Sequence, residues 1–134
     1  MEKKTDLDSF IVSEDKLDES LLAETVKPFL LRILPDGIPE YTLKFKKLSA
    51  ARKLLAEILI KKIKFVKGVT NTASEEVSIK ELLGKKDVLG MGEESIRKSF
   101  NRELKEIVRK GEYGYYVPNY NIQKVREYFE NGKK

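Results

Sequence analysis

A regular run of apolar residues at helical spacing between residues 49 and 68 constrains the fold of this sequence more than any other feature. Ser49 is a favourable N-cap, and Gly68 ends the run. Lysines crowd the C-terminal end, where they complement the helix dipole. The main apolar face consists of Ala51, Leu54, Leu55, Ile58, Leu59, Ile63 and Val66. Because Ile60 and Phe65 lie off this face, the pattern indicates a long helix that is buried on two sides.

The chain contains no cysteine and no histidine. This excludes disulfides, Cys/His zinc sites and catalytic triads that depend on Cys or His. A metal site would have to be built from carboxylates and would suit a hard ion such as Mg²⁺. No Gly-x-x-x-x-Gly-Lys-Ser/Thr run is present, so the sequence does not predict nucleotide hydrolysis. We therefore expect a protein that is not an enzyme and that needs no cofactor or metal.

The length and the apolar pattern favour one domain inside the cell. The chain has 134 residues, which is enough for one domain with a modest core. No apolar run approaches the roughly 20 residues needed to cross a bilayer. The first ten residues contain two lysines but no apolar stretch behind them, so they are not a secretory signal. These observations predict a cytoplasmic protein without a membrane partner.

The net charge of +5 conceals an asymmetry along the chain. Residues 1–40 contain five Lys/Arg and ten Asp/Glu, whereas residues 41–134 contain 22 Lys/Arg and 12 Asp/Glu. A basic region beside an acidic arm is common among nucleic-acid-binding proteins, although many basic surfaces bind nothing in particular. The sequence thus divides into an acidic helical arm, 1–40, and a basic domain, 41–134.

The arm is expected to be helical after a partly disordered stretch at residues 1–12. Apolar residues recur at helical spacing over 17–34, and Pro28 should kink or split that helix. The tract 34–39, rich in Pro and Gly, is the clearest loop. Two interpretations of the arm stay open: it pairs with a second copy in a homodimer, or it is an extra helix that covers the core.

The basic domain shows an ordered series of further elements. Alternation from Tyr41 to Phe45 predicts a short extended segment before the long helix. Ser78-Ile79-Lys80-Glu81 is a capping box that opens a short helix, which Gly84 ends. A connection with two glycines, 85–92, leads to a longer helix whose apolar positions are Ile96, Phe100, Leu104 and Ile107. A two-stranded hairpin near 109–117 and a final helix from Asn121 to about 131 complete the chain.

This order of elements resembles the winged helix-turn-helix family over about residues 49–118. The resemblance is carried by Val77-Ser78-Ile79-Lys80-Glu81-Leu82-Leu83, by Glu94-Ser95-Ile96-Arg97-Lys98-Ser99-Phe100 and by Gly111-Glu112-Tyr113-Gly114-Tyr115-Tyr116-Val117. These segments correspond to the second helix, the recognition helix and the wing. The connection between the two helices is longer than the three or four residues of a tight helix-turn-helix. The resemblance implies a mainly α (α+β) fold with a small hairpin wing, extra N- and C-terminal helices, and DNA as partner.

The residues themselves supply candidate contacts to nucleic acid. With the apolar face of the helix after residue 93 buried, its opposite face presents Arg97, Lys98, Asn101, Arg102 and Lys105. Arginine can contact guanine or phosphate, and Asn101 can pair with adenine. The hairpin adds Arg109, Lys110 and Tyr113. The alternative interpretation of the helix is a solvated face whose lysines keep the protein soluble.

The sequence favours a double-stranded DNA-binding protein, either a transcriptional regulator or a replication-associated factor. Two other hypotheses remain. Winged helices also serve as protein-interaction modules in larger assemblies, and the tyrosines around the hairpin could stack on unpaired RNA bases. Alternation in a strand sends Tyr115 and Tyr116 to opposite faces, so at least one of them is expected in the core.

Overall fold

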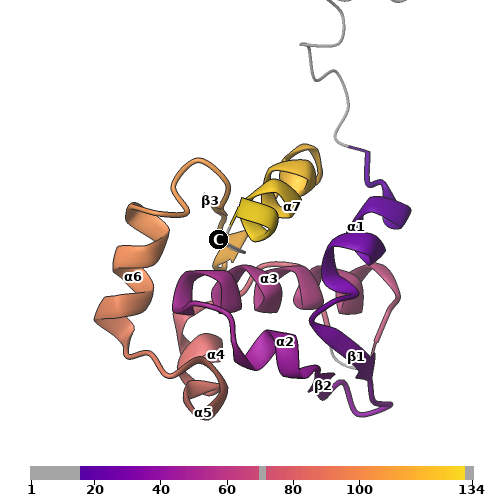
Figure 1. Ribbon diagram of the computed structural model, residues 1–134, viewed down its shortest axis with the longest axis horizontal. Helices are drawn as coiled ribbons and strands as arrows, with labels where there is room; N and C mark the ends of the chain where they lie inside the picture. Colours follow the sequence, from indigo (N-terminus) through magenta and orange to yellow (C-terminus); the bar gives the residue numbers. More distant parts are fainter. Residues whose placement is uncertain (1–15, 70–71, 132–134) are drawn as a thin grey trace, which may run out of the picture.

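The computed structural model describes residues 16–69 and 72–131 and shows a mainly helical α+β fold (Figure 1). It contains two separate two-stranded antiparallel sheets, β1–β2 and β3–β4. The expected disorder at 1–12 lies outside the described residues. The elements are α1 (Glu19–Val26), β1 (Leu30–Ile33), β2 (Pro39–Tyr41), α2 (Leu43–Lys46), α3 (Ala50–Val66), α4 (Ile79–Leu83), α5 (Lys86–Leu89), α6 (Glu93–Asn101), β3 (Arg109–Lys110), β4 (Tyr115–Tyr116), the 3₁₀ helix η2 (Asn119–Asn121) and α7 (Ile122–Asn131).

Helix α3 crosses the middle of the molecule, and the other elements pack around it (Figure 1). Ser49 caps it as expected by accepting a hydrogen bond from the Arg52 amide. Leu54, Leu55, Ile58 and Leu59 are fully buried, and Ile60 is 2% exposed. Each such side chain stabilises the fold by roughly 1.5–3 kcal/mol through burial. The predicted burial on two sides is confirmed through Ile60, but it does not extend to the C-terminal end of α3, where Phe65 is 41% exposed and Val66 is 38% exposed.

The N-terminal part differs from the helix that the periodicity of 17–34 predicts. Asp18 caps α1, which ends at Val26, and the chain then enters strand β1. Pro28 cannot continue the helical hydrogen-bond pattern, and β1 instead pairs with β2 across a turn in which Gly37 has a φ of +87°. Local periodicity predicted a helix because it does not register this strand pairing.

Helix α2 replaces most of the extended segment expected after Tyr41. The Thr42 hydroxyl accepts from the Phe45 amide at 3.4 Å and donates to the Pro28 carbonyl oxygen at 2.6 Å. Phe45 is 1% exposed and stacks on Tyr41 with ring centroids 4.1 Å apart. The cap and the burial of Phe45 favour one helical turn over an extended chain.

The described part of the acidic segment, residues 16–40, packs as an integral part of this fold. The expected boundary after residue 40 falls inside the β1–β2 sheet. Leu22 and Val26 of α1 are buried, and the rings of Phe29 and Phe129 lie 4.7 Å apart. The solvent-facing residues of α1 are Glu19, Ser20, Ala23 and Glu24. This matches an extra helix that covers the core, and it leaves α1 without an exposed apolar face for pairing with a second copy.

The central helices follow the predicted caps but not all of the predicted lengths. The capping box at Ser78 is present, and Gly84 is the C-cap of α4. The 85–92 connection is partly helical, because α5 forms there and places Leu89 in the core with Met91 beside it. Helix α6 ends at Asn101, earlier than expected, and turns carry Leu104 to a fully buried position.

The predicted hairpin is present as β3–β4 and is joined to the strand-like residue before α4. Val77 and Tyr115 exchange two backbone hydrogen bonds, both 2.8 Å long. A Cβ atom on Gly114 would lie 2.4 Å from the Val77 carbonyl oxygen, so the close approach of these backbones requires glycine. The hairpin is therefore fixed to the start of α4 as well as to its own turn.

Two polar groups on α3 are buried with partners. Lys62 is 2% exposed, and its Nζ donates to Glu75 Oε1 and to Asn119 Oδ1, each at 2.6 Å. Glu57 is 4% exposed, accepts from the Tyr41 hydroxyl and pairs with Lys85 at 2.9 Å. Burial and the neighbouring Glu57 raise the pKa of Tyr41 above its usual value. These pairs tie the segments around α3 to the helix.

Across residues 16–69 and 72–131, no helix has the length and apolar character needed to cross a membrane.

The buried Lys62 pair gives a stability prediction. Glu75→Gln should lower the free energy of unfolding by about 2 kcal/mol, because it leaves a buried ammonium with weaker partners. Glu75 is 28% exposed, which reduces the effect below that of a fully buried pair. Lys62→Met removes the charge itself and should cost less. Urea unfolding of both variants measures the difference, and a larger loss for Lys62→Met would contradict this assignment.

Candidate nucleic-acid interface

Helix α6 is anchored by the apolar face that the sequence indicates. Ile96 is fully buried and Phe100 is 4% exposed. The ring of Phe100 stacks on Tyr115, with centroids 4.0 Å apart and an angle of 15° between the rings. Tyr115 is half-buried and packs against the core, and this contact sets α6 directly against the β3–β4 hairpin. The opposite face of α6 points to solvent.

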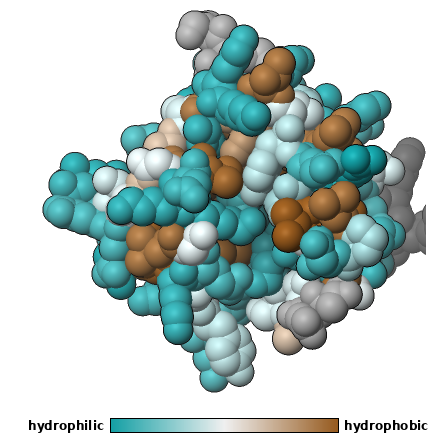
Figure 2. All heavy atoms as spheres, turned by 90° about the horizontal axis from the view of Figure 1, so that it is seen from below, coloured by the Kyte–Doolittle hydropathy of each residue, from teal (hydrophilic) through white to brown (hydrophobic). Residues whose placement is uncertain are grey.

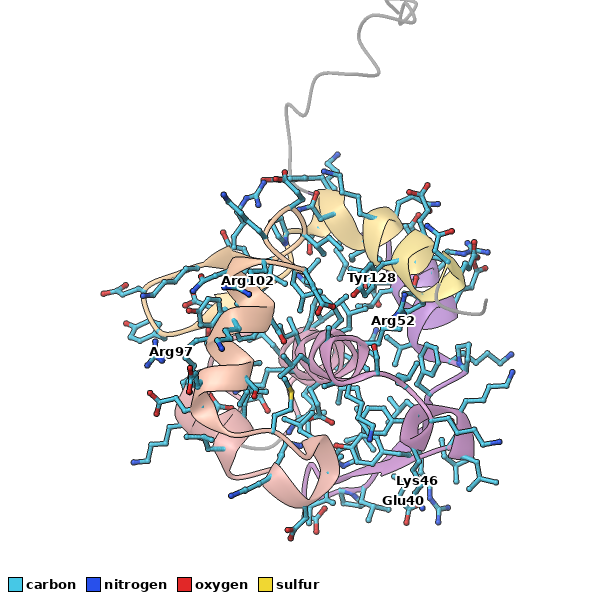
Figure 3. The ribbon with its side chains drawn as sticks, turned by 60° about the vertical axis from the view of Figure 1, so that its left-hand side comes forward. Glu40, Lys46, Arg52, Arg97, Arg102 and Tyr128 are labelled. Atoms are coloured by element: carbon cyan, nitrogen blue, oxygen red, sulfur yellow. The ribbon has the colours of Figure 1, made fainter. Side chains whose placement is uncertain are left out.

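All of the predicted contact residues are exposed, but they do not share one helix. Only Arg97, Lys98 and Asn101 belong to α6, and Arg102 is its C-cap. Figure 3 shows Arg97 and Arg102 on the α6 side of the molecule. The others follow α6 in turns and in the hairpin: Lys105, Arg109, Lys110 and Tyr113. These residues were expected mainly on the exposed face of one helix. They instead form a bent surface, because α6 is shorter than its periodicity predicts.

The two basic side chains on α6 are paired with its own carboxylates. Arg97 Nε lies 3.1 Å from Glu93 Oε2, and Lys98 Nζ lies 3.4 Å from Glu94 Oε1. Both pairs are exposed and separated by one helical turn, so each contributes only about 0.3–0.5 kcal/mol. The glutamates also favour the positive end of the helix dipole. A DNA phosphate could replace these glutamates at a small cost in free energy, but α6 by itself has no excess positive charge.

The turns and the hairpin carry the cations that lack such partners. In the described part of the chain no carboxylate lies within 4.0 Å of the charged groups of Arg102, Lys105, Arg109 or Lys110. Arg109 Nη1 instead donates to the Lys105 carbonyl oxygen at 3.3 Å. Residues 93–112 contain six Lys/Arg and five Asp/Glu, a net charge of +1. The surface is thus less basic than its cations alone suggested.

The hairpin turn is held by Glu76, a residue that the sequence analysis missed. Its carboxylate accepts hydrogen bonds from the amides of Tyr113 at 2.7 Å and Gly114 at 2.9 Å. A Cβ atom on Gly111 would lie 2.4 Å from this carboxyl group. Glu76 therefore fixes the turn that presents Tyr113, which is 70% exposed. Its position next to Glu75 in a polar connection offers no signal of this contact.

A second basic surface was also missed as a candidate. Residues 42–56 contain five Lys/Arg and no Asp/Glu. They form α2 and the start of α3, away from α6, as the position of Lys46 in Figure 3 shows. The absence of acidic residues between Glu40 and Glu57 was the available signal. From the sequence, these cations were expected in two different elements, an extended segment and the face of a helix.

A pocket of about 820 Å³ lies between α1, α2, α3 and α7, away from α6. Its lining includes Phe29 and Phe129, the lysines Lys44 and Lys47, and a group of three charged residues that bind each other. Arg126 pairs with Glu24 and Glu130, each at 3.3 Å. The Arg52 guanidinium lies 4.3 Å from the centre of the Tyr128 ring and donates to the Tyr128 carbonyl oxygen (Figure 3). Burial and a hydrogen bond to Glu103 raise the pKa of Tyr128.

No group of three or more Asp and Glu side chains that could hold a metal ion occurs among residues 16–69 and 72–131. Comparison of the chain with protein-family models, with curated proteins and with solved structures found no match.

The hairpin contact gives a second prediction. Glu76→Ala removes the acceptor of two turn amides and should lower the free energy of unfolding by about 1–2 kcal/mol. Hydrogen exchange at Tyr113 and Gly114 should become roughly tenfold faster or more, since about 1.4 kcal/mol corresponds to a factor of ten. Glu112→Ala in the same turn is the control, because Glu112 is exposed and makes no such contact. Equal exchange rates in the two variants would show that Glu76 does not hold the turn.

Proposed function

We propose that this chain is a non-enzymatic winged-helix protein that binds double-stranded DNA through α6 and the β3–β4 hairpin. The observation that carries the proposal is the packing of Phe100 on Tyr115, which sets an exposed helix beside an exposed hairpin. The order α3, Val77, α4, α5, α6 and β3–β4 supports the winged-helix assignment, with Val77 as the first strand of a small sheet. In this assignment α6 is the recognition helix and β3–β4 is the wing.

The dimensions of α6 suit the major groove. With its side chains an α-helix is about 10–12 Å across, and the groove is about 12 Å wide. Arg97 and Asn101 lie one turn apart on the exposed face and would read base edges. Because α6 is electrically balanced, it contributes selectivity more than affinity in this proposal.

Affinity would come from the cations that follow α6. Arg102, Lys105, Arg109 and Lys110 are exposed and would contact phosphates on either side of the groove. The Tyr113 hydroxyl, at the tip of the wing, would donate a hydrogen bond to the phosphate backbone of the DNA. Such contacts do not depend on sequence and release counterions, so binding should weaken steeply with salt. A regulator of transcription or a replication-associated factor would use both kinds of contact.

The near-neutral charge of residues 93–112 favours one alternative, a protein-interaction module. Deleting the acidic arm cannot separate these two functions, because α1 and β1 belong to the core. Removing residues 1–40 would expose the buried Phe129 by taking away Phe29. Substitutions of exposed side chains are the appropriate test.

The double variant Arg97→Ala, Arg102→Ala should bind a mixed pool of duplexes more weakly than the wild type. Loss of the Arg102 phosphate contact should reduce the slope of log K against log salt by about 0.9, and loss of the Arg97 base contact should lower the affinity further. The control is Lys80→Ala, Lys124→Ala, which removes two exposed cations from α4 and α7. Salt-titrated fluorescence anisotropy measures both. An unchanged slope and affinity in the Arg97, Arg102 variant would exclude DNA binding through α6.

A further inference from the structure

The segment from Thr42 to Ala56 concentrates positive charge that the rest of the fold does not neutralise. It contains five Lys/Arg and no Asp/Glu. Arg52 is engaged by Ser49 and by the Tyr128 carbonyl oxygen. The remaining four cations, which we call the α2 lysine patch, are Lys44, Lys46, Lys47 and Lys53. Within the described ranges, no carboxylate lies within ion-pairing distance of any of these four.

The carboxylates that belong to the neighbouring elements are already engaged. Glu40 of β2 pairs with Arg32. Glu24 of α1 pairs with Arg126 at 3.3 Å. Glu57 of α3 is buried with Lys85 and the Tyr41 hydroxyl. Within residues 16–69 and 72–131 the α2 lysine patch is therefore not matched by carboxylates, whereas the two cations of α6 are matched by glutamates on the same helix.

The backbone beneath the patch is held in place by α2. Phe45 is buried on the Tyr41 ring, and the Thr42 hydroxyl donates to the Pro28 carbonyl oxygen. Lys44, Lys46 and Lys47 are exposed around this turn, and Lys53 Nζ lies 5.9 Å from the centre of the Phe45 ring. Because the turn is fixed, the patch presents its charges from a rigid base, which limits the ordering cost of binding to the lysine side chains.

The patch lies on a different face from α6. Figure 3 places Lys46 and Arg97 at separate ends of the molecule. Figure 2 shows the molecule from the side on which α2 lies in Figure 1, and hydrophilic side chains there surround separate apolar areas. A ligand of the patch would thus meet the protein independently of a ligand on α6.

We propose that the α2 lysine patch is a second nucleic-acid-binding surface, which takes the phosphate backbone without reading sequence. Lysine is a compact point charge on a flexible stem and suits phosphate oxygens more than the paired donors and acceptors of base edges. The patch contains no Asn, Gln or Arg, the side chains that read bases most often. This inference rests on the proposed function, because it assumes that the protein binds DNA. Its lysines and the variants that test it are different from those of α6.

Two surfaces on separate faces can engage nucleic acid in two ways. The patch either holds a second duplex while α6 holds the first, or contacts a more distant part of one duplex that bends around the protein. In both arrangements the lysines of the patch bind a row of phosphates.

The test uses the full chain with the triple variant Lys44→Gln, Lys46→Gln, Lys47→Gln. The control is Lys80→Gln, Lys86→Gln, Lys124→Gln, which removes the same charge from exposed lysines of α4, α5 and α7. One measurement is the salt dependence of binding to a single 40-bp duplex. The other is capture of a labelled duplex by the protein already bound to an immobilised duplex.

We expect the α2 variant to lose about 2–3 units of salt slope on the 40-bp duplex or to lose capture of the second duplex. The control should keep both. Loss of capture alone indicates two duplexes, and loss of slope alone indicates one duplex that reaches both faces. An α2 variant that matches the control in both measurements, as expected if the patch serves an acidic protein or solubility, overturns the proposal.

The same pair of variants in the Arg97→Ala, Arg102→Ala background separates the two proposals. If the α6 substitutions change nothing and the α2 substitutions weaken binding, the patch is a nucleic-acid surface and α6 is not. If only the α6 substitutions weaken binding, α6 is the DNA contact and the patch is not.

Discussion

The burial of α3 on nearly all sides is the constraint on which the rest of this structure depends. A 17-residue helix with fully buried leucines on more than one face must be surrounded, and a chain of this length has few elements with which to do so. Helix α1 covers one part of it together with α7, whose Tyr128 contacts Arg52 of α3, and α5, α6 and strand β4 cover another. The same demand brings Lys62 and Glu57 into the interior, where each needs an opposite charge. The polar connections around α3 supply those charges.

The parts of the fold that are encoded by neighbouring residues could be predicted from the sequence. Ser49 and Ser78 cap their helices through their own side chains, and Gly84 ends α4, so these boundaries follow from local chemistry. Elements that depend on distant partners could not be predicted in the same way. Strand β1 forms because residues 39–41 return beside it, and α6 ends at Asn101, where turns replace the expected last part of the helix. The spacing of apolar residues along the sequence indicates neither feature.

The candidate site shows the same division in its electrostatics. Exposure of Arg97 and Lys98 could be predicted, since Ile96 and Phe100 set the buried face. Their pairing with Glu93 and Glu94 follows from the spacing of one helical turn, and it lowers the effective charge of α6. The role of Glu76 could not be predicted, because the amides that donate to its carboxylate lie 37 and 38 residues later in the chain. The distribution of net charge along the sequence therefore overestimated the positive charge of the α6 surface, and it did not lead to the α2 lysine patch.

The Glu76 contact has a consequence for the mechanics of the molecule. The tip of the hairpin, the strand-like residue Val77 and the first turn of α4 are bound to one another, and Phe100 joins α6 to the same frame. The spacing between helix and hairpin is thus set by the protein interior and not by what lies outside. Any macromolecule that touches both must adjust its own shape to that spacing, so the work of deformation falls on the partner.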